Sequence, residues 1–403
     1  MKLNLYKILF ELYSFLFIYT MINREFLFFG IDLRFIILII GIILLFFFFF
    51  TKNKSNKKLP ICANKIYKVL FILFFWSLLS NISWLWNGLE KFPKEIINQN
   101  ILILNNFFAV IIFKKYYYCL EEERIKKNVI FSCIVLVISI VLTGLGLSLS
   151  QISGSDARSI VHASISAAEH KNIFGGNFRL AGYAEDPNYA SIFLVLGSIT
   201  SLQLYCKNRT KYFLCALFLL AFCFSCSKTI LLSFFLGIIY LIFIYFFRRK
   251  GFPKILNLLF SIFIISLIIF LPVSRLLSTH TTMATRFKMW NMAKELFLSS
   301  PIIGNGINAF KSYINSNYNG LWYVQCHSTY WQLLSETGLV GFLIFINLMV
   351  KCLNNYNLTK YNKYLLFIFF VFIINFETIQ LQVFVYIIFI ISLFGRNNAE
   401  EGF

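Results

Sequence analysis

The sequence predicts an all-α integral membrane protein with about twelve transmembrane helices and two long periplasmic loops. Hydrophobic residues make up 59% of the 403 residues, and charged residues only 13%. Apolar runs of spanning length also recur along the whole chain. A water-soluble domain of this composition could not cover its apolar surface, so soluble classes are excluded. We therefore treat residues 1–403 as a single polytopic membrane domain.

Runs of about 15 to 22 apolar residues can cross a bilayer as helices that rise ~1.5 Å per residue. No small-residue cleavage site follows the first run, so it is interpreted as a retained span and not as a removed signal peptide. The eleventh run is short, which fits a tilted or partly re-entrant helix. The predicted spans lie near 3–22, 33–51, 66–83, 97–113, 129–149, 188–206, 211–225, 229–247, 255–273, 329–350, 363–375 and 378–394.

The net charge of +20 is distributed unevenly between the loops. Lys and Arg concentrate in alternate connections, near 52–65, 114–127, 207–211, 248–254 and 351–363. The positive-inside rule makes these loops cytoplasmic and places both termini in the cytoplasm. Because the basic residues fall in short loops and form no basic domain, nucleic-acid binding is excluded.

Two outer loops are long, at about 150–187 and about 274–327. Long ordered loops usually carry function, because crossing a membrane does not require them. All four histidines lie in these loops, at His162, His170, His280 and His327. They show no metal-ligand spacing with cysteines or carboxylates, so we expect no metal and no cofactor. The nine cysteines lie mostly in spans or inner loops and form no disulfide framework.

The segment 178–194 combines a helix start with an arginine. Asp186 and Pro187 suit the N-cap and the first helical position, and Asn188 then begins a span. This capping role is sufficient to explain the Asp-Pro-Asn run. It does not explain Arg179, whose guanidinium could form a forked contact with a phosphate near the headgroups.

Two further stretches carry cations on the outer side. Lys228 lies in a very short outer turn. Two interpretations are open: a lysine that snorkels from a helix end, or a contact for an anion. Arg286, Trp290, Ala293 and Phe297 recur at helical spacing, which predicts an amphipathic helix on the outer surface. On such a helix, Arg286, Lys288 and Lys294 could simply meet lipid phosphates. Pro301, Gly304 and Gly306 end this helix in a tight turn that lets the backbone approach a ligand or another helix.

The stretch 323–342 places a histidine at the entrance of the tenth span. If a helix begins near Ser328, then Ser328, Gln332, Ser335 and Glu336 form one polar stripe at helical spacing. Such a stripe is costly against lipid, so we expect it to face the protein interior or a wet cavity. A single histidine is more often a packed residue than a catalyst. The position of His327 beside the polar stripe favours a functional role for it.

Taken in order, these motifs resemble the O-antigen ligase and polymerase superfamily over about residues 178–342. The resemblance rests on Arg179-x2-Gly182 with Pro187-Asn188, Ser227-Lys228, Arg286-x3-Trp290, Pro301-x2-Gly304-x-Gly306, His327 and Glu336-x-Gly338-Leu339-x-Gly341. Two features depart from the family pattern. Ser328 follows the histidine where the family often has asparagine, and no glycine stands ten residues after Arg179 or Arg286 as in some polymerases.

The resemblance implies a metal-independent glycosyl transfer at the periplasmic face of the bacterial inner membrane, with a sugar chain on undecaprenyl diphosphate as the donor. Positioned cations would stabilise the leaving diphosphate, and a neutral imidazole would take the proton of the acceptor hydroxyl. His327 and Arg286 are the implied catalytic residues. The implied substrate-binding residues are Arg179, Lys228, Lys288, Trp290, Gly304, Gly306, Asn188 and Glu336.

Within this superfamily, Arg-x2-Gly followed by Pro-Asn favours a polymerase of lipid-linked repeat units. The alternative is a ligase that transfers the finished chain to lipid A–core. A transporter or flippase would also suit about twelve spans, but it predicts short loops and repeat symmetry. Besides the lipid-linked donor and membrane lipids, the polymerase interpretation implies a chain-length regulator and a flippase as partners.

Overall fold

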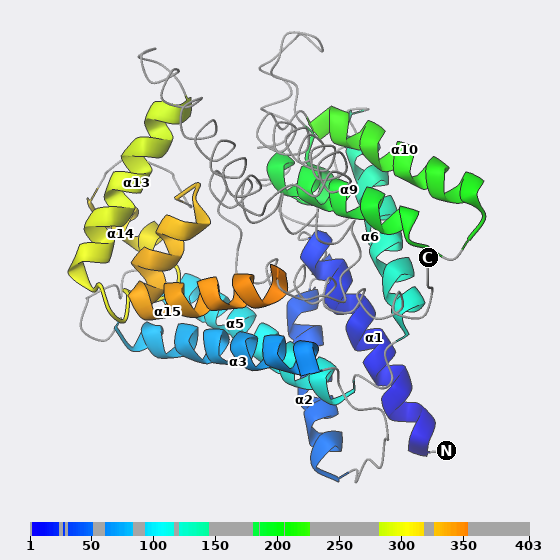
Figure 1. Ribbon diagram of the computed structural model, residues 1–403, viewed down its shortest axis with the longest axis horizontal. Coiled ribbons are helices and arrows are strands. Elements are labelled where there is room, and N and C mark those ends of the chain that lie inside the picture. Colours follow the sequence, from blue (N-terminus) through cyan, green and yellow to red (C-terminus); the bar gives the residue numbers. More distant parts are fainter. Residues whose placement is uncertain are drawn as a thin grey trace, which may run out of the picture. The chain divides into compact units, whose positions relative to one another are not determined.

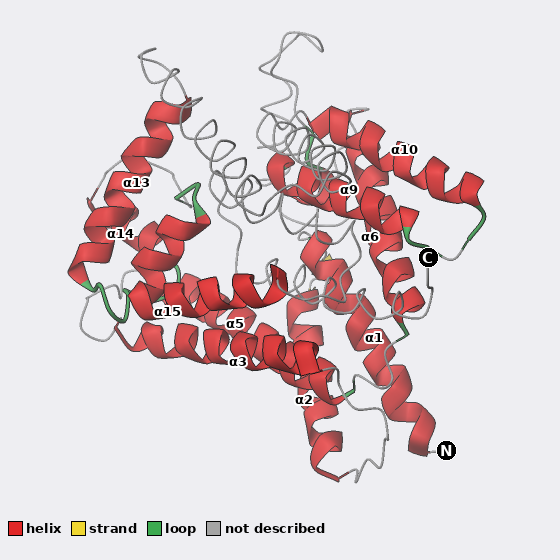
Figure 2. Ribbon diagram, viewed as in Figure 1, coloured by secondary structure: helices red, strands yellow, loops and turns green. Residues whose placement is uncertain are grey.

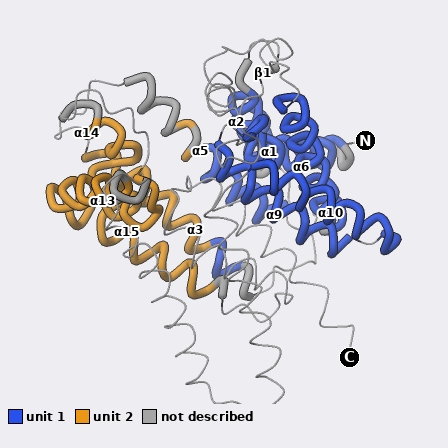
Figure 3. The backbone as a smooth tube through the Cα atoms, turned by 90° about the horizontal axis from the view of Figure 1, so that it is seen from above, with its two compact units in different colours: residues 1–67, 104–231, 385–403 blue, residues 68–103, 232–384 orange. Residues whose placement is uncertain are grey.

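We analysed a computed structural model of the chain, which divides into two compact units (Figure 3). Unit 1 comprises residues 1–67, 104–231 and 385–403, and unit 2 comprises residues 68–103 and 232–384. The structure describes residues 2–23, 27–28, 31–50, 61–83, 93–116, 121–144, 180–184, 186–204, 206–225, 282–317 and 326–353.

Almost all of the described elements are helices (Figures 1 and 2). They are α1 (Lys2–Ile22), α2 (Leu33–Phe50), α3 (Ile61–Ser80), η1 (Asn81–Ser83), α5 (Pro93–Lys115), α6 (Glu122–Gly144), η3 (Gly182–Ala184), α9 (Pro187–Leu202), α10 (Asn208–Ser225), α13 (Thr282–Ser299), α14 (Ala309–Asn317) and α15 (Thr329–Leu353). Between α1 and α2 the two-residue strands β1 (Leu27–Phe28) and β2 (Ile31–Asp32) pair in antiparallel register.

The helical membrane fold expected from the sequence is confirmed at this level. The helices α1, α2, α3, α5, α6, α9, α10 and α15 coincide with predicted spans. Among the described residues, four stretches are long and apolar enough to cross a bilayer, namely Leu5–Ile22, Asn64–Ser83, Glu123–Gly144 and Thr329–Lys351. The predicted spans near 229–247, 255–273, 363–375 and 378–394 lie outside the described residues. The total of about twelve therefore stays a prediction.

In unit 1, every residue of α9 from Asn188 to Ser201 is buried. This helix packs against α6 and α10. Small residues make this close packing possible. A Cβ at Gly197 would lie 2.9 Å from the sulfur of Cys133, so only glycine lets α6 approach here. Helices packed around small residues are typical of membrane bundles.

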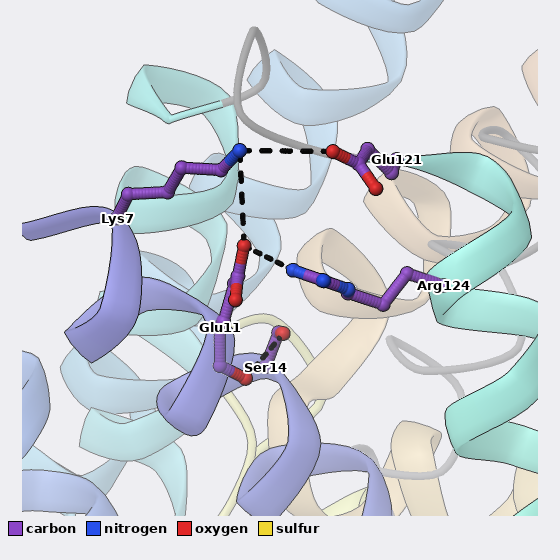
Figure 4. A network of polar contacts seen from close by, with 5 residues as sticks. All are labelled: Lys7, Glu11, Ser14, Glu121 and Arg124. Carbon is purple, nitrogen blue, oxygen red and sulfur yellow. Dashed lines mark hydrogen bonds and ion pairs between the residues drawn. The ribbon is translucent and has the colours of Figure 1, made fainter. Parts of the chain in front are cut away.

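Contacts between helix ends show which termini share one end of unit 1. Lys7 and Glu11 of α1 face Glu121 and Arg124 at the start of α6 (Figure 4). Lys7 Nζ lies 3.7 Å from a Glu121 carboxylate oxygen, and Arg124 forms an ion pair with Glu11. The amine of Lys126, also in the first turns of α6, donates to the Gln203 carbonyl at the end of α9. The N-termini of α1 and α6 therefore lie with the C-terminus of α9.

The opposite end of these helices meets the segment 180–184. The Tyr183 N–H donates to the Ser139 hydroxyl of α6 at 3.0 Å, and the Leu180 N–H donates to the Phe224 carbonyl of α10 at 3.3 Å. Gly182 has φ +53°, and a Cβ there would lie 2.2 Å from Ser139 Oγ. The glycine of the Arg-x2-Gly motif is thus required for close packing of η3 on α6.

In unit 2, α13 and α14 form a helical hairpin beside α15, and α3 also contacts α15 (Figure 1). The indole N–H of Trp76 in α3 donates to the Thr337 carbonyl of α15 at 2.9 Å. The hairpin and α15 contain most of the residues singled out from the sequence.

Candidate active site

The α13–α14 hairpin has its own apolar core. This core joins both helices to the segment just before α15, and it consists of Met289, Met292, Ala293, Leu296, Ala309, Phe310, Ile314 and Cys326. The α13 members recur at positions i, i+3, i+4 and i+7, the pattern of one helix face. The amphipathic helix predicted here is therefore present, but its apolar face packs against protein, whereas the sequence analysis assigned it to the membrane surface.

Gly338 interrupts α15 and exposes its backbone to the hairpin. Its φ of 67° and ψ of −173° are not helical, although helix continues on both sides. In an unbroken helix the N–H groups of Leu339 and Val340 would donate to Ser335 and Glu336. They donate instead to the carbonyls of Pro301 at 2.8 Å and Ile302 at 3.4 Å.

The turn between α13 and α14 completes this exchange. The N–H of Asn305 donates to the Ser335 carbonyl at 3.1 Å, and the N–H of Gly306 donates to the Glu336 carbonyl at 2.8 Å. The turn and the helix break thus satisfy one another's backbone groups, which buried backbone requires. Two motifs separated by about thirty residues in the sequence form one interlocked structure.

Three glycines are needed for the interlock. Gly304, Gly306 and Gly338 have φ of 85°, 91° and 67°, a region that residues with a Cβ rarely adopt. A Cβ at Gly304 would lie 2.4 Å from the Glu336 carbonyl oxygen. A Cβ at Gly338 would lie 2.3 Å from the Ile302 carbonyl oxygen. The tight turn expected at Gly304 and Gly306 is present, and it brings the backbone close to another helix.

Asn305, between these glycines, is buried and joins three segments. Its side-chain amide donates to the Leu296 carbonyl at 2.6 Å and to the Ser335 carbonyl at 3.1 Å. Its carbonyl oxygen accepts from the Ser299 hydroxyl at 3.0 Å. The end of α13, the turn and α15 are thereby held together.

Glu336 and Gln332 link α15 to the histidine loop. The Glu336 carboxyl group accepts the backbone N–H groups of Asn308 and Phe310 at the start of α14. The Gln332 amide donates to Glu336 Oε1 at 2.7 Å, and its own oxygen accepts the Cys326 N–H at 3.0 Å. The predicted polar stripe therefore faces the protein interior, and it reaches the residue next to His327.

His327 lies at the junction of this loop with α15. Its backbone is left-handed, with φ 51°, which is uncommon for a residue with a side chain and is concentrated at functional sites. The residue is partly exposed, while its Nδ1 atom is buried. The preceding Cys326 is buried in the hairpin core, and burial raises the pKa of its thiol, so that it stays a neutral packing residue. A half-exposed imidazole on a firmly held backbone suits proton transfer.

The candidate residues on α13 lie in the same unit as His327. Trp290 packs against the hairpin core that also contains Cys326, so the Arg-x3-Trp motif and the histidine loop meet in one cluster. Arg286 is partly exposed, and Lys288 is exposed. These cations can meet an anionic ligand without first being uncovered.

Of the three candidate residues that precede α13 in the chain, the structure describes one. Arg179 and Lys228 lie outside the described residues. Asn188 belongs to unit 1, in the first turn of α9, where the Asp186 carboxylate accepts its N–H at 2.6 Å. The predicted cap at Asp186 is confirmed, since this carboxylate also accepts the Tyr189 N–H at 3.3 Å. Capping thus accounts for the position of Asn188.

Sequence reasoning missed several residues that hold the site. Asn305 stands between two singled-out glycines, and a buried amide in a turn was the available signal. Trp76 and Asn81 gave no local signal, because their partners, Thr337 and Ile307, are more than two hundred positions away in the chain. The Asn81 side chain accepts the Ile307 N–H at 2.7 Å.

Across the residues that the structure describes, no group of three or more His, Cys, Asp or Glu side chains could hold a metal ion. The expectation of metal-independent chemistry stays a prediction.

The spanning helices and the polar hairpin at one helix entrance define a multi-pass membrane protein with a candidate active site around His327. Residues 213–346 match the family model described as O-antigen ligase. This match confirms the predicted resemblance to the O-antigen ligase and polymerase superfamily, whose members are glycosyltransferase-like enzymes. It covers the hairpin, His327 and Glu336 but not Arg179 or Asn188. No curated protein matches the chain.

Proposed function

We propose that this protein polymerises lipid-linked oligosaccharide repeat units at the periplasmic face of the bacterial inner membrane. The observation that carries the proposal is His327, which has a left-handed backbone, lies beside an interlocked hairpin and falls within the family match. The donor is a growing chain on undecaprenyl diphosphate. The acceptor is a hydroxyl at the free end of another lipid-linked unit. The product is an O-antigen or capsule-type polysaccharide.

In the proposed reaction, the acceptor oxygen forms a bond to the anomeric carbon of the donor sugar, and the bond from that carbon to the diphosphate breaks. His327 takes the hydroxyl proton through Nε2 as the new bond forms. The diphosphate leaves as an anion with the bonding electron pair. Arg286 and Lys288 stabilise that developing charge, and no metal ion is needed.

The polymerase assignment rests on the sequence motif Arg179-x2-Gly182 followed by Pro187-Asn188. The packing on α6 explains the glycine of that motif, since a Cβ at Gly182 would meet Ser139. A specific observation favours the second candidate, a ligase that transfers the chain to lipid A–core: the matching family model is described as O-antigen ligase.

Contacts between helix ends support the proposed orientation. The N-terminus of α1 lies with the Lys- and Arg-rich start of α6, as expected if both face the cytoplasm. The segment 180–184 lies at the other end of these helices, toward the proposed periplasmic side.

Deleting the gene separates the two candidate reactions. For a polymerase, we expect single repeat units on lipid A–core and the loss of long chains, because ligation continues without polymerisation. Gel electrophoresis of the lipopolysaccharide measures this directly. Complete loss of attached repeat units would identify the ligase, and unchanged long chains in both the lipopolysaccharide and the capsule would reject both reactions.

A further inference from the structure

The end of α13 and the turn that follows it expose large apolar side chains. Leu298 is 63% exposed, Ile302 is 64% exposed and Ile303 is 39% exposed. Scattered apolar residues are normal on a protein surface, but neighbouring ones at the tip of a hairpin form a patch that water disfavours. The charged residues of α13, such as Lys288 and Lys294, come earlier in the helix. Polarity therefore changes along the hairpin, from a charged portion to an apolar tip.

This apolar tip continues onto a spanning helix. The backbone hydrogen bonds of Pro301 to Leu339 and of Ile302 to Val340 hold the turn against the second half of α15. Leu339 is 46% exposed, and Leu343, one turn further on, is 56% exposed. The two apolar surfaces therefore meet.

The length of α15 gives the depth in the bilayer at which the turn contacts this helix. Its apolar second half ends at Lys351, and about twenty residues are needed to cross the hydrocarbon layer. Counting back from Lys351 reaches Trp331, which marks the outer boundary of that layer. Leu339 is then roughly 12 Å below the boundary at ~1.5 Å per residue. The turn bonded to Leu339 has the same depth.

Non-helical backbone at that depth must have its polar groups satisfied by protein. Pro301 has no N–H, and the carbonyls of Pro301 and Ile302 accept bonds from α15. The N–H groups of Asn305 and Gly306 donate to α15, and the Asn305 side chain bonds to the end of α13 and to α15. The interlock thus supplies protein partners for these backbone groups of the turn.

We propose that the tip of the hairpin, Leu298–Ile303, is re-entrant: it dips into the outer half of the bilayer and contacts the acyl chains of membrane lipids. Leu298, Ile302 and Ile303 extend the lipid-facing surface that Leu339 and Leu343 begin on α15. The loop stays on the outer side of the membrane. Its tip anchors the hairpin and so fixes the height of His327 above the bilayer. This proposal does not depend on which reaction the site performs.

Fluorescence quenching by lipids tests the contact directly. Ile302→Trp and, separately, Leu298→Trp are made in the full chain and reconstituted in nanodiscs of phosphatidylcholine with brominated acyl chains. Subtracting the emission of the parent protein removes the six native tryptophans. Because bromine quenches indole only in contact with it, we expect both introduced tryptophans to lose emission relative to unbrominated nanodiscs. Two sites guard against one variant failing to fold.

Asn291→Trp is the matched control, since Asn291 is exposed on the same helix and lies about 10 Å from Leu298 at ~1.5 Å per residue. Its emission should not change with bromination. Tryptophans at 298 and 302 that are quenched no more than the one at 291 would place the tip outside lipid and overturn the proposal. Equal, strong quenching at all three positions would also overturn it, since the whole of α13 would then lie in the membrane.

Discussion

The left-handed backbone at His327 makes some substitutions more informative than others. Asparagine and glycine tolerate φ near 51°, whereas alanine strains the turn. His327→Asn therefore keeps the backbone and the ability to form hydrogen bonds, and it removes only the proton acceptor. If His327 is the general base, activity in the purified, reconstituted enzyme should fall by roughly 10²–10⁴-fold. The rate of polymer formation at matched protein concentration measures this.

His327→Gly is the control for the backbone. It should fold as well as His327→Asn and should lose as much activity, because neither side chain can take the proton. Near-native polymer from His327→Asn would reduce the histidine to a structural residue. The base would then have to be another group.

Arg286 provides a test of geometry at constant charge. In Arg286→Lys the ammonium cannot make the forked contact that a guanidinium makes with diphosphate. We expect a loss of roughly tenfold in activity, which corresponds to one charge-assisted hydrogen bond of about 1.5 kcal/mol. Lys294→Ala removes an exposed charge two turns further along α13 and should leave activity unchanged. Equal activity in Arg286→Lys and the parent would mean that Arg286 contributes only general surface charge.

At the scale of elements, the interlock of the turn with the break in α15 should be sensitive to single methyl groups. Gly304→Ala and Gly338→Ala each add a Cβ within 2.4 Å of a backbone atom of the other segment. The unfavourable φ alone costs about 1–3 kcal/mol. We expect both variants to lower the midpoint of thermal unfolding in detergent and to abolish activity, because the hairpin separates from α15.

A helical glycine in α2 serves as the comparison. In Gly41→Ala the new methyl would meet only side chains, the nearest being the Tyr13 ring at 3.3 Å. Alanine also favours helix by about 1 kcal/mol over glycine. Its unfolding midpoint should stay close to that of the parent. Midpoints for Gly304→Ala and Gly338→Ala as high as that of Gly41→Ala would contradict the interlock.

At the scale of the whole molecule, the charge alternation predicts the side of each loop. Arg209→Cys introduces a thiol just before the apolar portion of α10. Asn291→Cys introduces one on α13. In spheroplasts, a membrane-impermeant maleimide should label position 291, and it should label position 209 only after lysis. Mass spectrometry of the peptides distinguishes these sites from the native cysteines. Labelling of 209 but not of 291 in spheroplasts would place the candidate site on the cytoplasmic face and end the proposed mechanism.

Local patterns were sufficient for much of the molecule because they act through neighbours in the chain. Apolar runs predicted α1, α6 and α15, and the Asp186-Pro187 pair predicted the start of α9. The periodicity around Trp290 predicted α13, although it did not show what the apolar face would contact. The turn at Gly304 and Gly306 and the inward-facing stripe through Glu336 were also predicted, since glycine freedom and the cost of burying polar groups are local properties.

The sequence by itself determined that this is a helical membrane protein, where its apolar helices lie and which residues are candidates for chemistry. Only the tertiary structure decided how those candidates are held. It showed that Gly338 breaks α15, that the broken backbone pairs with the turn at Gly304, and that Asn81 and Trp76 support them from far away in the chain. The physical reason is that a buried N–H or carbonyl must find a partner, but many distant segments could supply one, and composition does not choose among them.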